Sequence, residues 1–579
     1  MSKIERELLS RESRYGKRYK WVALSNTTLG VLMAAIDGSI VLISLPAIFN
    51  GLGINPLDPS NASYLLWLLL GYTVILSATV VTIGKLSDMF GRVRLYNLGF
   101  LVFTVGSILV YLSSLFVHGT SGALSLIVFR LVQGLGGGFL FANSAAIITD
   151  AFPHNERGRA MGINQIAGVG GSLLGMIIGG ILAATDWHLI FLISVPVGIA
   201  GTIWAYLALH ELAVVKEKQR IDIPGNVTFA LAVTSLLIGL TMALSPYGKS
   251  AMGWSNPVVI GLFTAGIMLL ALFIYIEMKV AQPMLHLRLF RIRAFAAGML
   301  SLLLAGIARG GLQLLLVIWL QGIWLPLHGI SFANTPFQAA IAMLPMGIGF
   351  LIAGPLSGYL SDKYGARTFT VFGMCVNAVA FLALAALPAN FSYPVFMVII
   401  FFAGAGQGIF ASPNLAAIMS SVPPQNRGMT GGMVATFFNV SYAISLALFF
   451  SLLSSGLISA GLSAYISHGL GSEGLSSGTV NYISSISPTA AIFAAMLGYN
   501  PIAHLLPAQI LSSMPPSTYR IIIGEHFFPS LLSQPFKASM STIFYLSAFL
   551  AIIAALVSAM RGPKYLHEVG SAAIGSPGH

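Results

Sequence analysis

The feature that most constrains this chain is a series of long apolar segments that recur along its whole length. A helix needs about 20 mostly apolar residues to cross a bilayer, where lipid offers its backbone no hydrogen-bonding partner. Of the 579 residues, 56% are hydrophobic and 8% are charged. A soluble domain has about 25% charged residues. We therefore expect an all-α membrane protein.

We count fourteen candidate spans. The basic start of the chain precedes an apolar run that is too long for a signal-peptide core of about 7 to 15 residues, so we expect an uncleaved first span. The approximate bounds are 21 to 49, 63 to 84, 95 to 117, 122 to 150, 159 to 184, 188 to 210, 223 to 245, 255 to 279, 294 to 323, 337 to 360, 368 to 389, 394 to 422, 428 to 458 and 538 to 561.

Basic residues are distributed unequally between the two sides of these spans. If the N-terminus is cytoplasmic, 24 of the 29 Lys and Arg residues fall in cytoplasmic segments, and only Lys249, Arg520 and Lys537 lie outside. Cytoplasmic loops of membrane proteins carry such an excess. We predict a multi-pass protein of the plasma or inner membrane with both termini in the cytoplasm. This topology explains the net charge of +12 without a nucleic-acid partner.

The segment 459–537 is long for an outer loop. Its apolar pieces, such as 490–497, are too short to cross a bilayer, and Pro501, Pro507, Pro515 and Pro516 interrupt it. We expect an external hairpin or interfacial helices here. Two short re-entrant segments are the alternative.

Three short motifs occur twice, in the same order and at nearly the same spacing. Residues 84–92 (GKLSDMFGR) return at 358–367 (GYLSDKYGAR), 134–138 (GLGGG) at 404–408 (GAGQG), and 153–158 (PHNERG) at 423–428 (PPQNRG). The duplication predicts two homologous six-span halves. The segments are a cytoplasmic basic tail (1–20), an N-terminal six-helix bundle (21–210), a linker with two extra spans (211–293), a C-terminal six-helix bundle that includes the outer loop (294–561), and a cytoplasmic tail (562–579).

The chain resembles the fourteen-spanner drug:proton antiporter family of the major facilitator superfamily. Loop 84–96 is similar to its signature Gly-x-Leu-(Ser/Ala)-Asp-x-x-Gly-Arg-(Arg/Lys), although Val93 shifts the last basic position to Arg94. Stretches 67–72, 130–134 and 187–198 also resemble family patterns. The resemblance implies two six-helix bundles plus two inserted spans, with substrate bound between the bundles near the membrane midplane.

The duplicated loop is a candidate gate. Gly91 allows a tight turn between spans two and three, and Asp88 lies near helix ends and basic groups that it can bind. The resemblance implies that this cluster holds one state of an alternating cycle. The alternative is a solvated turn that only fixes topology. The gating residues that we assign are Gly84, Asp88, Gly91, Arg92, Asp362, Gly365 and Arg367.

Asp37, Arg130 and Arg309 are the ionisable residues that remain deep within the predicted spans. Each costs about 2.5 to 3.5 kcal/mol there, so such residues are usually functional, although a structural ion pair is the alternative. Asp37 matches the acidic position of the family's first-span signature. We assign it as the protonation site and Arg130 as the group that tunes it. The repeat maps Asp37 onto Arg309, so we also hypothesise opposite charges facing one cavity.

Apolar side chains with a few amides lie on the spans that line the cavity in the family. Such a surface suits amphiphilic molecules. An anionic substrate is an alternative, because two Arg residues are buried. Each residue could instead serve packing. The candidate cavity residues are Tyr72, Phe139, Phe141, Asn143, Gln165, Gln313, Trp319 and Gln321.

Span five carries a small-residue face at Gly168, Gly171, Gly175 and Gly179 that allows close helix packing. The family's antiporter signature has Gly-Pro here, whereas this chain has Gly175 followed by Met176. The loss of that Pro weakens the inference of antiport.

We expect a proton-coupled antiporter that exports small lipophilic or amphiphilic compounds, with proton-coupled uptake or metabolite transport as the alternative. An enzyme is disfavoured because no His-x-x-His lies on a span and no phosphate-binding Gly-rich loop is followed by Lys-Ser or Lys-Thr. A channel or receptor would leave the duplicated loop unexplained. The expected partners are a small-molecule substrate, protons and the lipid bilayer. We expect a monomer without metal or cofactor.

Overall fold

The computed structural model describes most of the chain, and the predicted tails 1–20 and 562–579 lie almost entirely outside the described residues. The described residues are 16, 18–54, 61–153, 156–212, 222–244, 247, 248, 250, 252–280, 287–423, 426–484, 486, 488–496, 500–502, 506 and 514–562. Over these ranges the chain is helical, with a single isolated β-bridge between Tyr247 and Ser250.

Fourteen helical spans among the described residues are long and apolar enough to cross a membrane, which confirms the predicted number. They are α2 (Tyr19–Leu52), α3 (Ala62–Phe90), α4 (Arg92–Phe116), α5 (Gly119–Ala151), α6 (Arg157–Thr185), α7 (Leu189–Leu192) with α8 (Ser194–Ala208), α9 (Ile223–Ala243), α10 (Pro257–Lys279), α11 (Arg293–Arg309) continued by α12 (Leu312–Trp319), the π-helix η4 (Leu320–Trp324) and α13 (Leu325–Leu327), α14 (Thr335–Tyr364), α15 (Ala366–Ala386), α16 (Tyr393–Ser420), α17 (Arg427–Ser459) and α24 (Phe527–Ala559). Short 3-10 turns, η3 (Leu287–Arg291) and η5 (Phe332–Asn334), precede α11 and α14.

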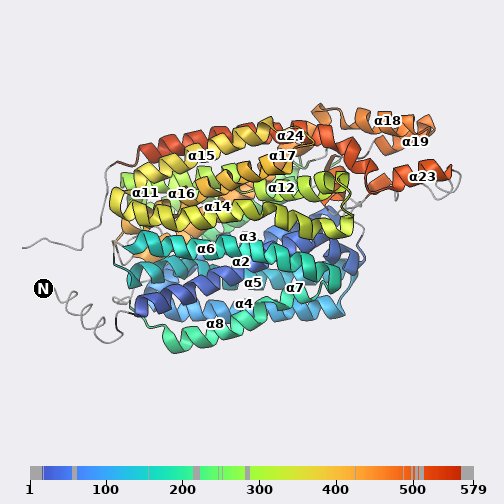
Figure 1. Ribbon diagram of the computed structural model, residues 1–579. Helices are drawn as coiled ribbons and strands as arrows, with labels where there is room; N and C mark the ends of the chain where they lie inside the picture. The colour runs from blue at the N-terminus through green and yellow to red at the C-terminus, as the bar shows by residue number, and fades with distance from the viewer. Residues whose placement is uncertain are drawn as a thin grey trace, which may run out of the picture.

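These helices lie side by side in one bundle (Figure 1). We call α2–α8 the N-terminal half, α11–α17 with α24 the C-terminal half, and α9–α10 the inserted pair. Helix α6 packs along α14 and helix α3 along α17, so these two contacts join the halves. Helices α9 and α10 pack on each other, and α9 also contacts α3 and α17. We call the end that carries the turns at Gly91 and Gly365 the basic end, which the charge pattern predicts to be cytoplasmic.

Glycines set the closest helix approaches. The predicted small-residue face on α6 packs against α2. A Cβ added at Gly175 would lie 2.2 Å from Ser39 Oγ, and one at Gly179 would lie 2.5 Å from Ile43 Cγ2. In the C-terminal half, a Cβ at Gly404 would lie 1.7 Å from the carbonyl oxygen of Met346, so α14 and α16 are in backbone contact.

The described residues of the long segment between α17 and α24 form short helices. They are α18 (Leu462–Ser472), α19 (Ser477–Ser484), α20 (Pro488–Met496) and α23 (Pro516–Ile523). Helices α18, α19 and α23 lie beyond one end of the bundle (Figure 1). Helix α20 differs, because Ala491, Ile492 and Ala494 are fully buried and the helix packs against α12, η4 and α17. The segment therefore covers the ends of spans that belong to the C-terminal half.

Two helices extend beyond the approximate span bounds expected from the sequence. The last helix begins at Phe527, so residues 527–537, which were expected in the outer loop, belong to α24. Pro535 lies inside this helix, where buried Leu532 and Phe536 pack on both sides of it. A proline removes one backbone hydrogen bond, and tertiary packing can offset that loss. The ninth span also continues to Leu327 rather than ending near 323.

We expect Gly404→Ala to lower stability by about 1 to 3 kcal/mol, the usual cost of overpacking, because α14 must move away from α16. Gly261→Ala is the matched control, since a Cβ there meets nothing within 4 Å. Thermal unfolding of the purified proteins in detergent measures both. Equal midpoints for Gly404→Ala and wild type would contradict the packing.

Candidate functional site

A polar network lies deep in the N-terminal half around Asp37 of α2. Asp37 is fully buried, and Arg130 and Gln133 of α5 are 2% and 0% exposed. Arg130 Nη1 donates to Asp37 Oδ2 at 3.3 Å, and Gln133 Nε2 donates to Asp37 Oδ1 at 2.7 Å. Residues 130 and 133 are three apart, so they share one face of the helix. Both carboxylate oxygens therefore have a donor from α5.

The network continues into two further helices. Gln133 Nε2 also donates to Ser107 Oγ of α4 at 2.8 Å. The Arg130 guanidinium lies 5.6 Å from the ring centroid of Tyr72 on α3, within the range of a cation–π contact. Helices α2, α3, α4 and α5 thus meet at one buried charge pair. Arg130 Nε and Tyr72 Oη are buried and have no hydrogen-bond partner among the described residues.

In such an arrangement, a proton added to Asp37 changes the contacts between helices. A buried ion pair survives only when its members neutralise each other, and removing one charge leaves the other uncompensated. Adding a proton to the carboxylate removes its attraction for Arg130 and one acceptor position for Gln133. The packing of four helices can therefore respond to one proton.

The charge beside Asp37 is Arg130, the residue that the sequence analysis assigns to tune it. Arg309 ends α11 and lies near Tyr442 of α17, and its buried Nε has no hydrogen-bond partner among the described residues. Helix α2 contacts α5, whereas α11 contacts α16, α17 and α24. That Asp37 and Arg309 face one cavity stays a hypothesis.

The duplicated loops lie at the basic end, and the first of them joins the two halves. Asp88 Oδ1 accepts from Arg92 Nη2 at 2.7 Å, while its Oδ2 accepts from the backbone amide of Met429 at 2.9 Å. Met429 lies in the first turn of α17. Arg92 also pairs with Asp150 of α5, and Asp150 Oδ1 accepts from Arg427 Nη1 at 3.3 Å. Charges of the N-terminal half thus hold the start of α17.

The second copy makes the reciprocal contact. Asp362 Oδ1 accepts from the amide of Gly158 at 3.0 Å, and its Oδ2 accepts from the amide of Arg159 at 3.2 Å. Both amides belong to the first turn of α6, whose free N–H groups and positive dipole end favour a carboxylate. We call the Asp88–Met429 and Asp362–Gly158 contacts the crossed caps. Each half therefore caps a helix of the other half.

The remaining gating residues have different places. Gly91 and Gly365 have φ of 108° and 89°, which L side chains rarely adopt, so the glycines form the two turns. Gly84 lies inside α3, where its carbonyl oxygen accepts from Ser87 Oγ at 2.7 Å. Arg367 is not one of the residues of the crossed caps. It lines a pocket at the start of α15.

The sequence reasoning missed Asp150, Gln133 and Glu211 as site residues. Glu211 follows α8 and accepts from the amides of Arg92 and Val93 at 3.0 and 2.9 Å, so it caps α4. Burial raises the pKa of Glu211, although these two amides favour its charged form. The spacing of Gln133 from Arg130 was a signal that could have been used. Nothing local marked Glu211, because its partner lies far away in the sequence.

The predicted cavity residues lie on several helices and make different contacts. Tyr72 belongs to the Asp37 network, and Gln313 Nε2 contacts Met176 Sδ of the other half at 3.8 Å. Asn143 Nδ2 donates to the carbonyl of Phe139 at 2.8 Å within α5. Gln321 is 3% exposed, while Phe139, Phe141 and Gln165 are half-buried.

Trp319, the remaining candidate cavity residue, is 1% exposed and packs against Phe391 and Phe544, with ring centroids 5.0 and 6.2 Å away. Both rings belong to the C-terminal half, so Trp319 packs among residues of its own half.

The family model of the Major Facilitator Superfamily matches residues 27–446. The chain belongs to this superfamily. It is 31% identical to the riboflavin transporter RibZ of Clostridioides difficile over 445 residues, which covers 76% of this chain and 90% of that protein. It is 26% identical to the multidrug transporter protein MdtP of Bacillus subtilis over 591 residues, covering 99% and 100%. The tetracenomycin C resistance and export protein of Streptomyces glaucescens is 26% identical over 437 residues, covering 75% of this chain and 76% of that protein.

Solved structures show the same fold. The proton:xylose symporter XylE bound to 6-bromo-6-deoxy-D-glucose matches with a TM-score of 0.54 and 14% identity, covering 83% of this chain and 95% of that one. The human organic anion transporter MFSD10 matches with a TM-score of 0.52 and 13% identity, covering 84% and 99%. The predicted resemblance to the superfamily is confirmed. The chain is a multi-pass membrane protein of a family of small-molecule transporters and not of enzymes.

We expect Asp362→Asn to loosen the basic end, because the amide keeps the shape of the carboxylate but loses its charge at the α6 N-terminus. The cost of losing a helix cap is about 0.5 to 2 kcal/mol. A cysteine placed at the buried Thr436, in a Cys375→Ser background, should react faster with a thiol reagent in this variant. Glu473→Gln in the outer segment is the charge-matched control. Equal reaction rates in the two variants would show that the crossed cap does not hold the halves together.

Proposed function

We propose that this chain is a proton-coupled antiporter that exports small lipophilic or amphiphilic compounds across the plasma or inner membrane, with both termini in the cytoplasm. The observation that carries the proposal is the fully buried Asp37 carboxylate, which shares its two oxygens between Arg130 and Gln133. The relatives named for multidrug resistance and export support the substrate class.

The proton acts through the ion pair. With Asp37 charged, Arg130 is neutralised and α2 stays tied to α5. With Asp37 protonated, the guanidinium is free to bind elsewhere, and the neighbouring Tyr72 ring is the nearest surface that attracts a cation. A ligand shifts such an equilibrium only by its different affinity for the two states. Substrate that binds beside Tyr72 favours one state of the pair and thereby couples to the proton.

Alternating access uses the crossed caps. When both caps are formed, the halves are closed at the basic end by hydrogen bonds to the first turns of α6 and α17. Opening this end requires that Asp88 and Asp362 both release their amides. The two halves then rock about a site between them, as in other transporters built from parallel repeats. Substrate residues in this scheme are Tyr72, Phe139, Phe141, Asn143, Gln165, Gln313 and Gln321, and Arg309 supplies a cation from the C-terminal half.

Proton-coupled uptake or metabolite transport is the second candidate. The observation that favours it is the similarity to a riboflavin transporter at 31% identity. The direction of substrate movement relative to the proton separates the two candidates. Antiport predicts that substrate added to everted vesicles causes protons to leave the vesicles. Symport predicts that protons and substrate move across the membrane in the same direction.

We expect Asp37→Asn to reduce substrate-driven proton movement by about tenfold or more, which corresponds to at least 1.36 kcal/mol in the coupled step. The measurement uses reconstituted vesicles with an imposed pH gradient and a panel of lipophilic cations, anions and neutral compounds. Asp186→Asn is the control, since Asp186 is an exposed carboxylate paired with His188. Intact coupling in Asp37→Asn would remove Asp37 from the mechanism.

Gln133→Leu tests whether the hydrogen bond to Asp37 matters to the coupling. The amide donor favours the charged carboxylate, so its loss favours the protonated form. We expect the pH of half-maximal transport to move upward while maximal transport falls less than in Asp37→Asn. An unchanged pH profile in the same vesicles would show that Gln133 only packs.

A further inference from the structure

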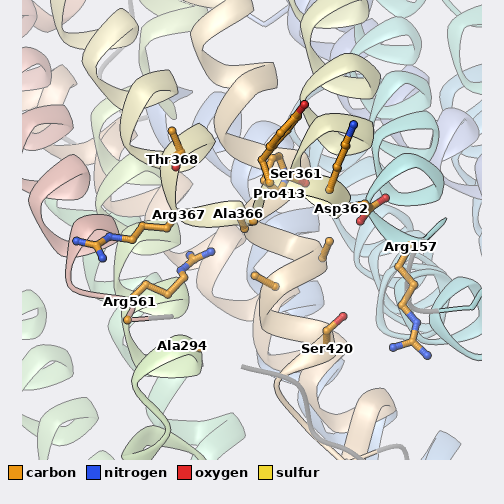
Figure 2. A pocket seen from close by; sticks show the side chains of 16 residues that line it. Arg157, Ala294, Ser361, Asp362, Ala366, Arg367, Thr368, Pro413, Ser420 and Arg561 are labelled. Carbon is orange, nitrogen blue, oxygen red and sulfur yellow. The ribbon is translucent and has the colours of Figure 1, made fainter. Parts of the chain in front are cut away.

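A cationic pocket lies at the basic end of the C-terminal half, apart from the Asp37 network. Its volume is about 340 Å³, and it is bounded by the end of α14, the starts of α11 and α15 and the ends of α16 and α24, with Arg157 at the start of α6 completing the lining. Four cations line it, namely Arg157, Lys363, Arg367 and Arg561, against the single carboxylate of Asp362. Figure 2 shows Arg367 and Arg561 on one side of Asp362 and Arg157 on the other. The carboxylate already accepts hydrogen bonds from two amides of α6.

Arg561 is the unusual member of this group. Its side chain is almost fully buried, at 4% exposed. Its Nη2 donates to Asn414 Oδ1, and Asn414 is itself held by a hydrogen bond to the carbonyl of Gly298 at 3.2 Å. Nε and Nη1 of Arg561 have no hydrogen-bond partner among the described residues. A buried guanidinium that keeps two nitrogens unsatisfied is costly unless an anion binds it.

The first turn of α15 faces the same pocket. Gly365, Ala366, Arg367 and Thr368 all line it, and the N-cap residue Gly365 has no side chain that could cap the helix. The free amides and the dipole of a helix N-terminus favour an anion. The pocket therefore combines a helix N-terminus with an unsatisfied buried guanidinium, and both attract negative charge.

The N-terminal half shows what occupies the equivalent position there. Helix α4 starts after Gly91, as α15 starts after Gly365, and both glycines have positive φ. The amides that begin α4 are capped by the carboxylate of Glu211, which lies just beyond the last helix of that half. The equivalent place just beyond α24 holds Arg561 and Gly562. The N-terminal half supplies an anion at this position, whereas the described residues of the C-terminal half supply a cation.

We propose that this pocket binds a phosphate or phosphodiester group from outside the chain, which caps α15 in the position that Glu211 occupies on α4. A tetrahedral anion has enough oxygens to accept from Arg561, from the α15 amides and from Arg367 at once. The source is either the headgroup of an anionic lipid or a free phosphate compound. Basic pockets between membrane helices on the cytoplasmic side suit such headgroups.

The bound anion acts on the crossed caps. Asp362 and Arg367 flank the turn at Gly365, so an anion that fixes the start of α15 also fixes the carboxylate that caps α6. Occupancy of the pocket therefore stabilises the arrangement that is closed at the basic end.

The test compares ligand-induced shifts in thermal unfolding of the purified full chain. Phosphatidylglycerol, phosphatidylcholine and inorganic phosphate are added separately to detergent-solubilised protein at matched ionic strength. A lipid source predicts a higher midpoint with phosphatidylglycerol than with phosphatidylcholine, and a free phosphate source predicts the rise with inorganic phosphate. Arg561→Gln should weaken half-saturation about tenfold, which corresponds to about 1.4 kcal/mol. Arg561→Lys should restore part of the effect, because it keeps the charge without the planar geometry.

Arg291→Gln is the matched control, since Arg291 is an exposed cation near the same end but outside the pocket. Native mass spectrometry counts bound phosphatidylglycerol and keeps the test valid if Arg561→Gln is itself less stable. The proposal fails if no phosphate compound shifts the midpoint, or if Arg561→Gln and Arg291→Gln respond alike. It also fails if Glu568→Gln removes the same stabilisation without added ligand, because the anion then belongs to the chain.

Discussion

The two halves of this transporter depend on hydrogen bonds between a carboxylate of one half and the first helical turn of the other. Asp88 binds the amide of Met429, and Asp362 binds those of Gly158 and Arg159. A helix begins with amides that no intrahelical carbonyl can satisfy. Each half therefore supplies a hydrogen-bond acceptor to free amides of the other half. The contact is reciprocal because the loop sequence occurs in both halves. The long contacts of α6 with α14 and of α3 with α17 continue the same interface into the membrane.

Away from this interface, buried charged groups are concentrated in a few places, because a charge in a low-dielectric environment is costly without a partner. The Asp37 network joins four helices of the N-terminal half, and the C-terminal half has only the cation Arg309 at the mapped position. The halves thus share a backbone plan but differ in charge. The same asymmetry appears at the basic end, where Glu211 caps α4 and Arg561 stands beside the start of α15. Duplication supplied the framework, and substitution then gave the halves different chemistry.

The proposed protonation site and the crossed caps lie in different parts of the molecule. Asp37 lies in the N-terminal half, while the crossed caps lie between the halves. In the proposed mechanism, coupling therefore passes through helices that contribute to both sites. Helix α3 carries Tyr72 beside the Arg130 guanidinium and Asp88 in the crossed caps, and α5 carries Arg130 and Asp150. These two helices therefore connect the proposed protonation site to the crossed caps.

The sequence alone determined the number of spans, the superfamily and the identity of the duplicated loop, because span length and motif spacing are local properties of the chain. It also determined that Asp37 and Arg130 are buried charges. The sequence further assigned Arg130 as the group that tunes Asp37. Only the tertiary structure decided that Gln133 is a second donor to Asp37, that Trp319 packs within its own half, and that α24 continues through Pro535. It likewise decided that Glu211 caps α4. Each of these outcomes depends on contacts between segments far apart in sequence, where the energy of packing and of shared hydrogen bonds outweighs any local preference.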